Sequence, residues 1–151
     1  MVKILFICHG NICRSPAAEI VFRELMPAAR VDSAATTTEE IGNGIYPPMR
    51  RALERRGIPL VPHRARQTVA ADYGKYDYII GMDEENRSDL NWIYHGDPEH
   101  KVSLLMEWAG ERREVSDPWY TRDFDAALDD IVQGCRALAE KIKRDMKTGK
   151  N

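Results

Sequence analysis

The sequence is poor in cysteine and contains no long apolar stretch. Three cysteines stand at irregular spacing among 151 residues. An odd, irregular set argues against a disulfide framework and for a reducing compartment, so we expect a cytoplasmic protein. No run of residues is long and apolar enough to span a bilayer, and the first residues lack the pattern of a signal peptide. We therefore expect neither a membrane partner nor export.

An excess of positive charge is also missing. The 22 lysines and arginines are balanced by 24 acidic residues, which gives a formal net charge of −2. This balance provides no overall attraction to nucleic acid, so no such partner is expected. The sequence shows no internal repeat, low-complexity tract or linker. We expect one domain, residues 1–151, with its own hydrophobic core.

What the sequence does contain is a distinctive stretch at residues 8–16, Cys-His-Gly-Asn-Ile-Cys-Arg-Ser-Pro. The apolar run 2–7 before it is typical of a buried strand. Pro16 suits the start of a helix, and residues 17–26 are mostly good helix formers. A tight loop between a strand and a helix start gathers backbone N–H groups and the positive end of a helix dipole at one point. We therefore predict an anion-binding loop.

The loop begins with Cys8 and carries Arg14 six positions later. Backbone N–H donors, a helix N-terminus and a guanidinium all favour the thiolate form of Cys8, which makes it a nucleophile. The planar fork of Arg14 matches two oxygens of a phosphate. Gly10 and Asn11 are expected to supply unusual backbone conformations. This pattern predicts attack by Cys8 on a bound phosphoryl group; the alternative is that Cys8 only packs in the core and Ser15 only caps the helix.

The rest of the chain alternates short strands with helices. Strands are expected at 30–35, 76–82 and 101–106, and helices at 16–26, 47–56, 84–94 and from 123 onwards, with a short helical segment at 68–73 and a polar loop at 107–120. Such alternation predicts an α/β fold, a parallel sheet with helices on both faces. Ligands of such folds bind at the carboxyl ends of the strands, which is where the Cys8 loop would lie.

Hydrolysis of a phosphate ester also needs an acid for the leaving group and a base for water. Asp117 is our candidate for both roles, because Pro118 restricts its backbone and the loop is long enough to arch over a pocket. The alternative is an ordinary turn, in which Asp-Pro pairs are common.

The stretch 8–16 resembles the phosphate-binding loop of the low-molecular-weight protein tyrosine phosphatases. The chain length and the late Asp117-Pro118 pair match that family too. The resemblance implies a four-stranded parallel sheet flanked by helices, hydrolysis of phosphotyrosine through a phosphocysteine, release of inorganic phosphate, and no cofactor or metal. It implies Cys8, Arg14 and Asp117 as catalytic residues. We expect a monomer and leave weak dimerisation open.

The resemblance also implies roles around the loop. Asn11, Ser15 and His63 would orient it through hydrogen bonds, and Cys13 would form a reversible disulfide with Cys8. The branched side chain of Ile12 favours aryl phosphates. We expect substrate to contact His9, Gly10, Asn11, Ile12, Cys13, Ser15, Glu40, Trp119 and Tyr120.

Both the peptide preference and the class of function are left open by the sequence. Many members of the family carry a tryptophan after the second strand, where this chain has Thr-Glu-Glu-Ile-Gly-Asn at residues 38–43. The competing functions are an arsenate reductase of the same fold and a non-enzymatic oxyanion-binding module. A reductase needs further cysteines on a mobile segment, and there is none between Arg14 and Gly134. A binding module needs neither Cys8 nor Asp117.

Overall fold

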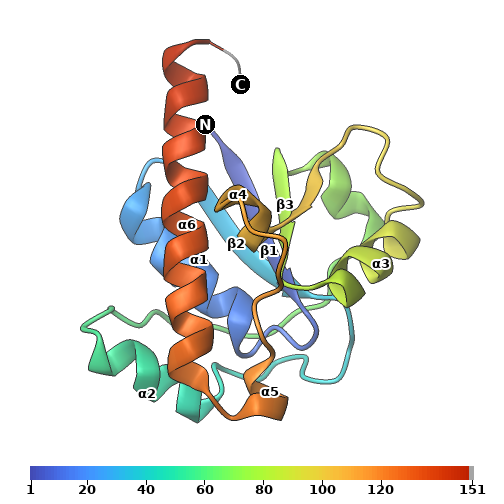
Figure 1. The fold of residues 1–151 in the computed structure, drawn as a ribbon. Helices are drawn as coiled ribbons and strands as arrows, with labels where there is room; N and C mark the ends of the chain where they lie inside the picture. Colours follow the sequence, from blue (N-terminus) through green and yellow to red (C-terminus); the bar gives the residue numbers. More distant parts are fainter. Residues whose placement is uncertain (150–151) are drawn as a thin grey trace.

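The structure is a computed structural model that describes residues 1–149. Its centre is a four-stranded sheet in the order β2-β1-β3-β4, and all three neighbouring pairs run parallel (Figure 1). The strands are β1 (Lys3–Cys8), β2 (Arg30–Ala35), β3 (Tyr78–Gly81) and β4 (Val102–Leu104). The predicted α/β fold with a four-stranded parallel sheet is therefore confirmed.

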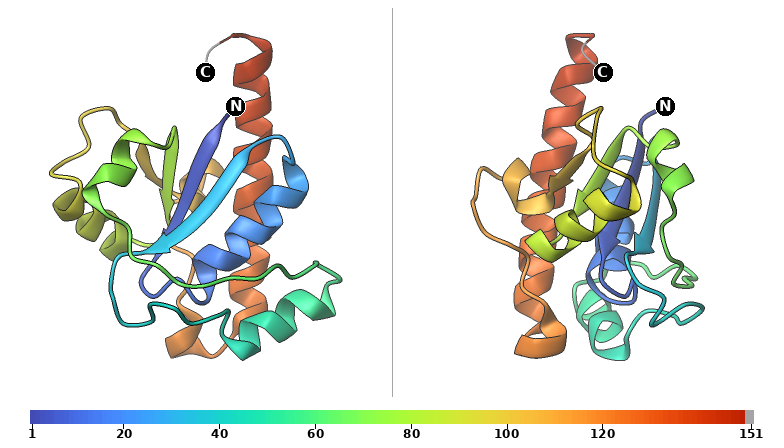
Figure 2. Two further views of the ribbon diagram at one scale, coloured as in Figure 1. Left: turned by 180° about the vertical axis from the view of Figure 1, so that it is seen from behind. Right: turned by 90° about the vertical axis from the view of Figure 1, so that its right-hand side faces the viewer.

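Helices cover both faces of the sheet, and β1 shows why. Its side chains alternate, as they must in a strand. Ile4 and Phe6 join the larger core with α1 and α6, while Leu5 and Ile7 join the smaller core with Leu90 of α3. Figures 1 and 2 show α1 and the long α6 side by side. The main helices are α1 (Arg14–Leu25), α2 (Pro47–Arg55), α3 (Glu84–Ile93) and α6 (Phe124–Lys147), and the segment η1 (Ala70–Gly74) is a 3₁₀ helix.

The sequence prediction is wrong in two places. The strand expected at 101–106 ends at Leu104, where α4 (Leu105–Trp108) begins, and the end of the polar loop expected at 107–120 forms a second short helix, α5 (Pro118–Thr121). Helices of one turn have little intrinsic stability. Tertiary contacts stabilise them: Leu105 is fully buried, and the carboxylate of Glu107 accepts the N–H of Leu104.

Helix α1 also begins earlier than predicted, at Arg14 rather than at Pro16. Cys13 occupies the N-cap position and forms no side-chain cap, so Ser15 is not the capping residue. The consequence is that Arg14 is part of the first helical turn, directly after the loop that begins at Cys8.

Packing of α6 against α4 depends on a glycine. A Cβ at Gly134 would lie 2.5 Å from Leu105 Cγ. We expect Gly134→Ala to destabilise the fold by about 1–2 kcal/mol, since overpacking outweighs the gain in helix propensity. The melting temperature should fall by roughly 3–8 °C in a domain of this size. The control is Gly74→Ala, where a Cβ meets nothing within 4 Å. Equal melting temperatures of the two variants would contradict the close contact.

Candidate active site

The carboxyl end of β1 leads into a loop that wraps around the sulfur of Cys8. The N–H of Asn11 lies 3.3 Å from Cys8 Sγ, and the N–H of Ser15 lies 3.4 Å away. The hydroxyl of Ser15 is 3.0 Å from the same sulfur. Three donor groups therefore surround one sulfur, an arrangement that stabilises negative charge there.

A buried network fixes the direction of the Ser15 proton. The side-chain amide of Asn11 donates to Ser15 Oγ at 2.8 Å and to Ser33 Oγ at 2.9 Å. Because Ser15 Oγ already accepts from that amide, its own proton is free to point at Cys8 Sγ. Ser33 in turn donates to the carboxylate of Glu19 at 2.6 Å.

Asn11 is held from outside the loop as well. Its φ is 60°, in the left-handed region that asparagine tolerates. His63 Nε2 lies 2.7 Å from the Asn11 carbonyl, and a carbonyl only accepts, so Nε2 carries a proton. The N–H of Arg66 donates to Asn11 Oδ1 at 3.2 Å. The structure thus brings His63 to the loop through Asn11.

Two expectations about the loop need correction. Gly10 does not adopt a positive φ; instead a Cβ there would lie 3.3 Å from Glu40 Cγ, so the glycine permits a close approach. Asn11 and Ser15 are fully buried beneath the loop and do not line the cavity above it. Their side chains support the loop, and their N–H groups point at Cys8 together with the Ser15 hydroxyl.

The guanidinium of Arg14 is held by groups that follow β3 and β4 in the chain. Nη1 donates to Asp83 Oδ2 at 2.9 Å and to the Val115 carbonyl at 2.8 Å, and Nη2 lies 3.5 Å from Asp117 Oδ2. Burial by itself lowers the pKa of Arg14. The charges of Cys8, Asp83 and Asp117 outweigh burial and raise that pKa, so the guanidinium stays charged.

Asp117 caps α5 and faces the loop. Its Oδ1 accepts the N–H of Trp119 at 2.9 Å, which leaves Oδ2 directed at Arg14. The ring of Trp119 lies 5.3 Å from that of Tyr46, and the two rings form an aromatic wall. Tyr120 is 82% exposed at the edge of this wall.

These residues enclose a cavity of about 520 Å³ over the Cys8 loop. It combines a sulfur, a guanidinium and a carboxylate with aromatic side chains. Its lining residues are Cys8, His9, Gly10, Ile12, Cys13, Arg14, Glu39, Glu40, Tyr46, Asp83, Glu85, Asp117, Trp119, Tyr120 and Phe124.

Comparison with known proteins places the chain in a family. The family model described as low molecular weight phosphotyrosine protein phosphatase matches residues 3–148. The chain belongs to this family. The predicted class of enzyme, a protein tyrosine phosphatase, is thereby confirmed.

Individual relatives agree with the family match. The chain is 41% identical to the human low molecular weight phosphotyrosine protein phosphatase, over 92% of this chain and 94% of the relative. The crystal structure of YfkJ from Bacillus subtilis has a TM-score of 0.91 at 33% identity, with 96% of each chain covered. The structure of Vibrio vulnificus Wzb in complex with benzylphosphonate has a TM-score of 0.85 at 29% identity, with 93% and 98% covered.

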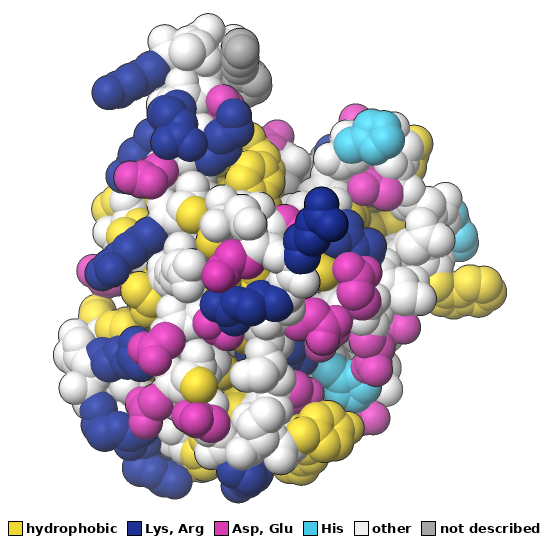
Figure 3. Space-filling view, in the orientation of Figure 1, with side chains coloured by type: hydrophobic (Ala, Val, Ile, Leu, Met, Phe, Trp, Pro, Cys, Tyr) yellow, Lys and Arg dark blue, Asp and Glu magenta, His cyan; other side chains and the backbone are white. Residues whose placement is uncertain are grey.

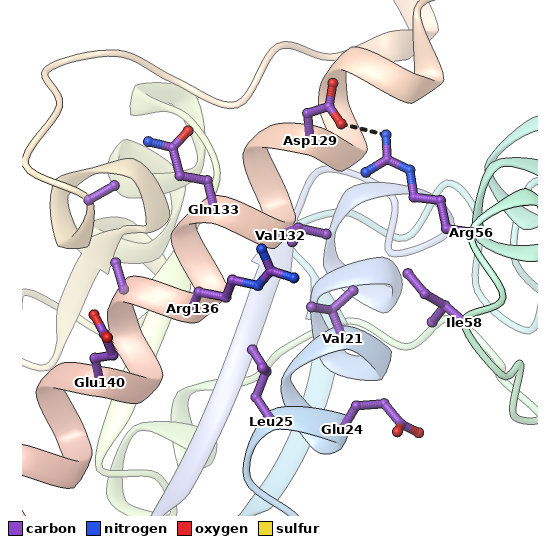
Figure 4. Close-up of a pocket in the computed structure, with 12 residues that line it drawn as sticks. Val21, Glu24, Leu25, Arg56, Ile58, Asp129, Val132, Gln133, Arg136 and Glu140 are labelled. Carbon is purple, nitrogen blue, oxygen red and sulfur yellow. Dashed lines mark hydrogen bonds and ion pairs between the residues drawn. The ribbon is translucent and has the colours of Figure 1, made fainter.

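A second cavity of this phosphatase, about 750 Å³, lies between α1, α6 and the segment after α2 (Figure 4). Val21, Leu25 and Val132 form an apolar floor, and an ion pair between Arg56 and Asp129 closes one side. Among its described lining residues there is no cysteine, serine or histidine. Although this cavity is larger, it offers no thiol or hydroxyl nucleophile, so the cavity over Cys8 is the candidate active site.

The other cysteines of the phosphatase differ from Cys8. All three are free. Burial, and then the neighbouring Cys8, raise the pKa of the Cys13 thiol well above its ordinary value. Cys135 is fully buried in the core on α6, and burial raises its pKa too. Formation of a Cys8–Cys13 disulfide stays a prediction.

Within residues 1–149, no group of three or more histidine, cysteine or acidic side chains could hold a metal ion. None of the helices in the same range is both long and apolar enough to cross a membrane.

Sequence reasoning missed two functional residues of the phosphatase. Asp83, which binds Arg14, lies two residues after the end of β3, and a carboxylate near the carboxyl end of a parallel strand is a usable signal. Tyr46 supplies the aromatic wall in place of the tryptophan absent from 38–43. Its position before Pro47-Pro48 gave no sign that it would reach Trp119.

Proposed function

We propose that this chain hydrolyses phosphotyrosine in proteins, and small aryl phosphates, through a phosphocysteine on Cys8. The observation that carries the proposal is the convergence of two backbone N–H groups and the Ser15 hydroxyl on one sulfur. Core packing does not require three donors around a thiol. A thiolate that attacks an electrophile does.

In the first step, Cys8 Sγ attacks phosphorus, so that an S–P bond forms and the bond from phosphorus to the aryl oxygen breaks. Arg14 and the N–H groups of the loop hold the equatorial oxygens while charge shifts. Asp117 gives its proton to the departing phenolate. A dianion that enters the cavity would lie beside Arg14 Nη2, which Asp117 Oδ2 approaches at 3.5 Å in the free enzyme.

In the second step, the Asp117 carboxylate takes a proton from water. The water oxygen attacks phosphorus, the S–P bond breaks, and inorganic phosphate leaves with Cys8 again a thiolate. Asn11, Ser15 and His63 act as positioning residues, because they orient the loop without touching the phosphoryl group. No metal or cofactor takes part in this scheme.

The aryl substrate is supported by the walls of the cavity. Tyr46 and Trp119 can flank a phenyl ring, and Ile12 faces the same space. The similar Wzb enzyme was solved with benzylphosphonate, a phenyl group one carbon away from a phosphonate. An arsenate reductase is disfavoured because the one remaining cysteine, Cys135, is fully buried and cannot pass a disulfide outward.

The direct test is to trap the intermediate. Mixing the enzyme with an aryl phosphate should give a rapid burst of phenolate, about one per enzyme, before slower turnover. Acid quenching during the burst should leave one phosphoryl group on the peptide that contains Cys8, as read by mass spectrometry. Phosphate on another peptide, or hydrolysis with neither burst nor phosphoenzyme, would overturn the covalent mechanism.

A further inference from the structure

We propose that the mouth of the active-site cavity selects phosphotyrosine peptides with lysine or arginine close to the phosphotyrosine. The selecting residues are Glu39, Glu40 and Glu85, called here the acidic rim. The inference rests on the proposed function of the Cys8 loop, and it adds the class of peptide that this site prefers.

The acidic rim is part of the same cavity as Cys8. Glu39 and Glu40 come from the segment after β2, and Glu85 comes from the first turn of α3. The side chains of Glu39 and Glu85 are 65% and 69% exposed, so a bound peptide can reach them. In Figure 3, acidic side chains gather around a histidine near the lower edge of the molecule.

Positive charge in the cavity does not neutralise the rim. His9 lies between two carboxylates, with Nε2 at 2.9 Å from Glu39 and Nδ1 at 3.3 Å from Glu85. One imidazole carries at most one positive charge, whereas the two carboxylates carry two negative charges. Glu40 accepts from the neutral amide of Asn43 at 2.7 Å.

Arg14 does not compensate for the rim either. It is the one lysine or arginine among the described residues that line the cavity. Its guanidinium is already within 2.9 Å of Asp83 and 3.5 Å of Asp117. The nearby Arg122 lies outside, over the rings of Tyr46 and Phe124 at 5.9 and 5.5 Å. The rim side of the mouth therefore carries uncompensated negative charge.

This charge has a consequence for substrates. A phosphate dianion that approaches the mouth is repelled by the rim, and glutamates on the same peptide add to the repulsion. Lysine or arginine beside the phosphotyrosine reverses the sign of the interaction and raises the rate of productive encounter. The aromatic wall lines the same cavity as the acidic rim, so the ring of the phosphotyrosine and the basic residue can be bound together.

The test compares three phosphotyrosine peptides of equal length, with two lysines, two alanines or two glutamates flanking the phosphotyrosine. At low salt, kcat/KM should follow the order lysine, alanine, glutamate, with roughly tenfold between the extremes. High salt should reduce this ratio, because exposed charges are screened. The triple variant Glu39→Gln, Glu40→Gln, Glu85→Gln should bring the ratio close to unity.

The matched control is Glu140→Gln, an exposed position on α6 outside this cavity, which should keep the wild-type ratio. Hydrolysis of an aryl phosphate whose aryl group carries no charge, measured in parallel, reports on the proposed function separately. Equal rates for the three peptides, with aryl phosphate hydrolysis intact and dependent on Cys8, would overturn the inference alone. An unchanged ratio in the triple variant would also overturn it. Single variants Glu39→Gln and Glu85→Gln, each expected to lower the ratio, serve if the triple variant does not fold.

Discussion

Cys8→Ser should reduce hydrolysis of an aryl phosphate by about 10⁵-fold, since the covalent route depends on this one nucleophile. The three donors around Sγ stabilise a thiolate. A serine hydroxyl in the same cradle is far harder to ionise, so it does not become the nucleophile. The measurement is the steady-state rate of phenolate release.

The same variant separates an enzyme from a binding module. Because Arg14 and the loop N–H groups are untouched, Cys8→Ser should still bind inorganic phosphate, as measured by calorimetry, and should keep its circular dichroism spectrum. A folded Cys8→Ser protein that retains hydrolysis within tenfold of wild type would rule out the phosphocysteine. Loss of phosphate binding together with activity would instead indicate collapse of the loop.

Asp117→Ala should lower the rate by roughly 10²–10⁴-fold, the usual contribution of general acid–base catalysis. The loss should depend on the leaving group. A nitrophenolate leaves readily without a proton, whereas phenolate itself needs one. The ratio of wild-type to variant rates should therefore rise steadily as the basicity of the phenol increases.

The matched control for Asp117 is Asp125→Ala, an exposed carboxylate paired with Arg55 on the α2–α6 surface. It should stay within about twofold of wild type, as expected for an exposed ion pair away from the site. A loss in Asp117→Ala that is equal for all leaving groups would contradict the role of acid in the first step. Asp117 would then act only in the second step, as the base that takes a proton from water.

The parts of the site that could be predicted from the sequence are those that local chain geometry determines. Cys8, Arg14 and the helix that follows belong to one short stretch, so strand, loop and helix signals were sufficient. Asp83 and Tyr46 reach the site from other elements, and their contacts depend on the sheet order. No local pattern encodes those distances.

The same distinction between local and long-range contacts explains where the sequence predictions were wrong. The helices α4 and α5 are each four residues long, and packing rather than propensity decides whether such turns form. Gly10 was expected to give the loop an unusual backbone conformation. Its small size instead makes room for Glu40, a residue 30 positions further along the chain and so outside the reach of local reasoning.

The contacts that hold the loop have a consequence for how the active site assembles. Asn11 is fixed by His63, which is 52 residues away, and Arg14 is fixed by Asp83 and Val115, which are 69 and 101 residues away. Closing such long intervals costs chain entropy that only the finished sheet offsets. A fragment ending at Leu25 would contain residues 8–16 but not His63, Asp83 or Val115, which hold Asn11 and Arg14. The nucleophilicity of Cys8 therefore depends on the completed tertiary structure and not on the motif alone.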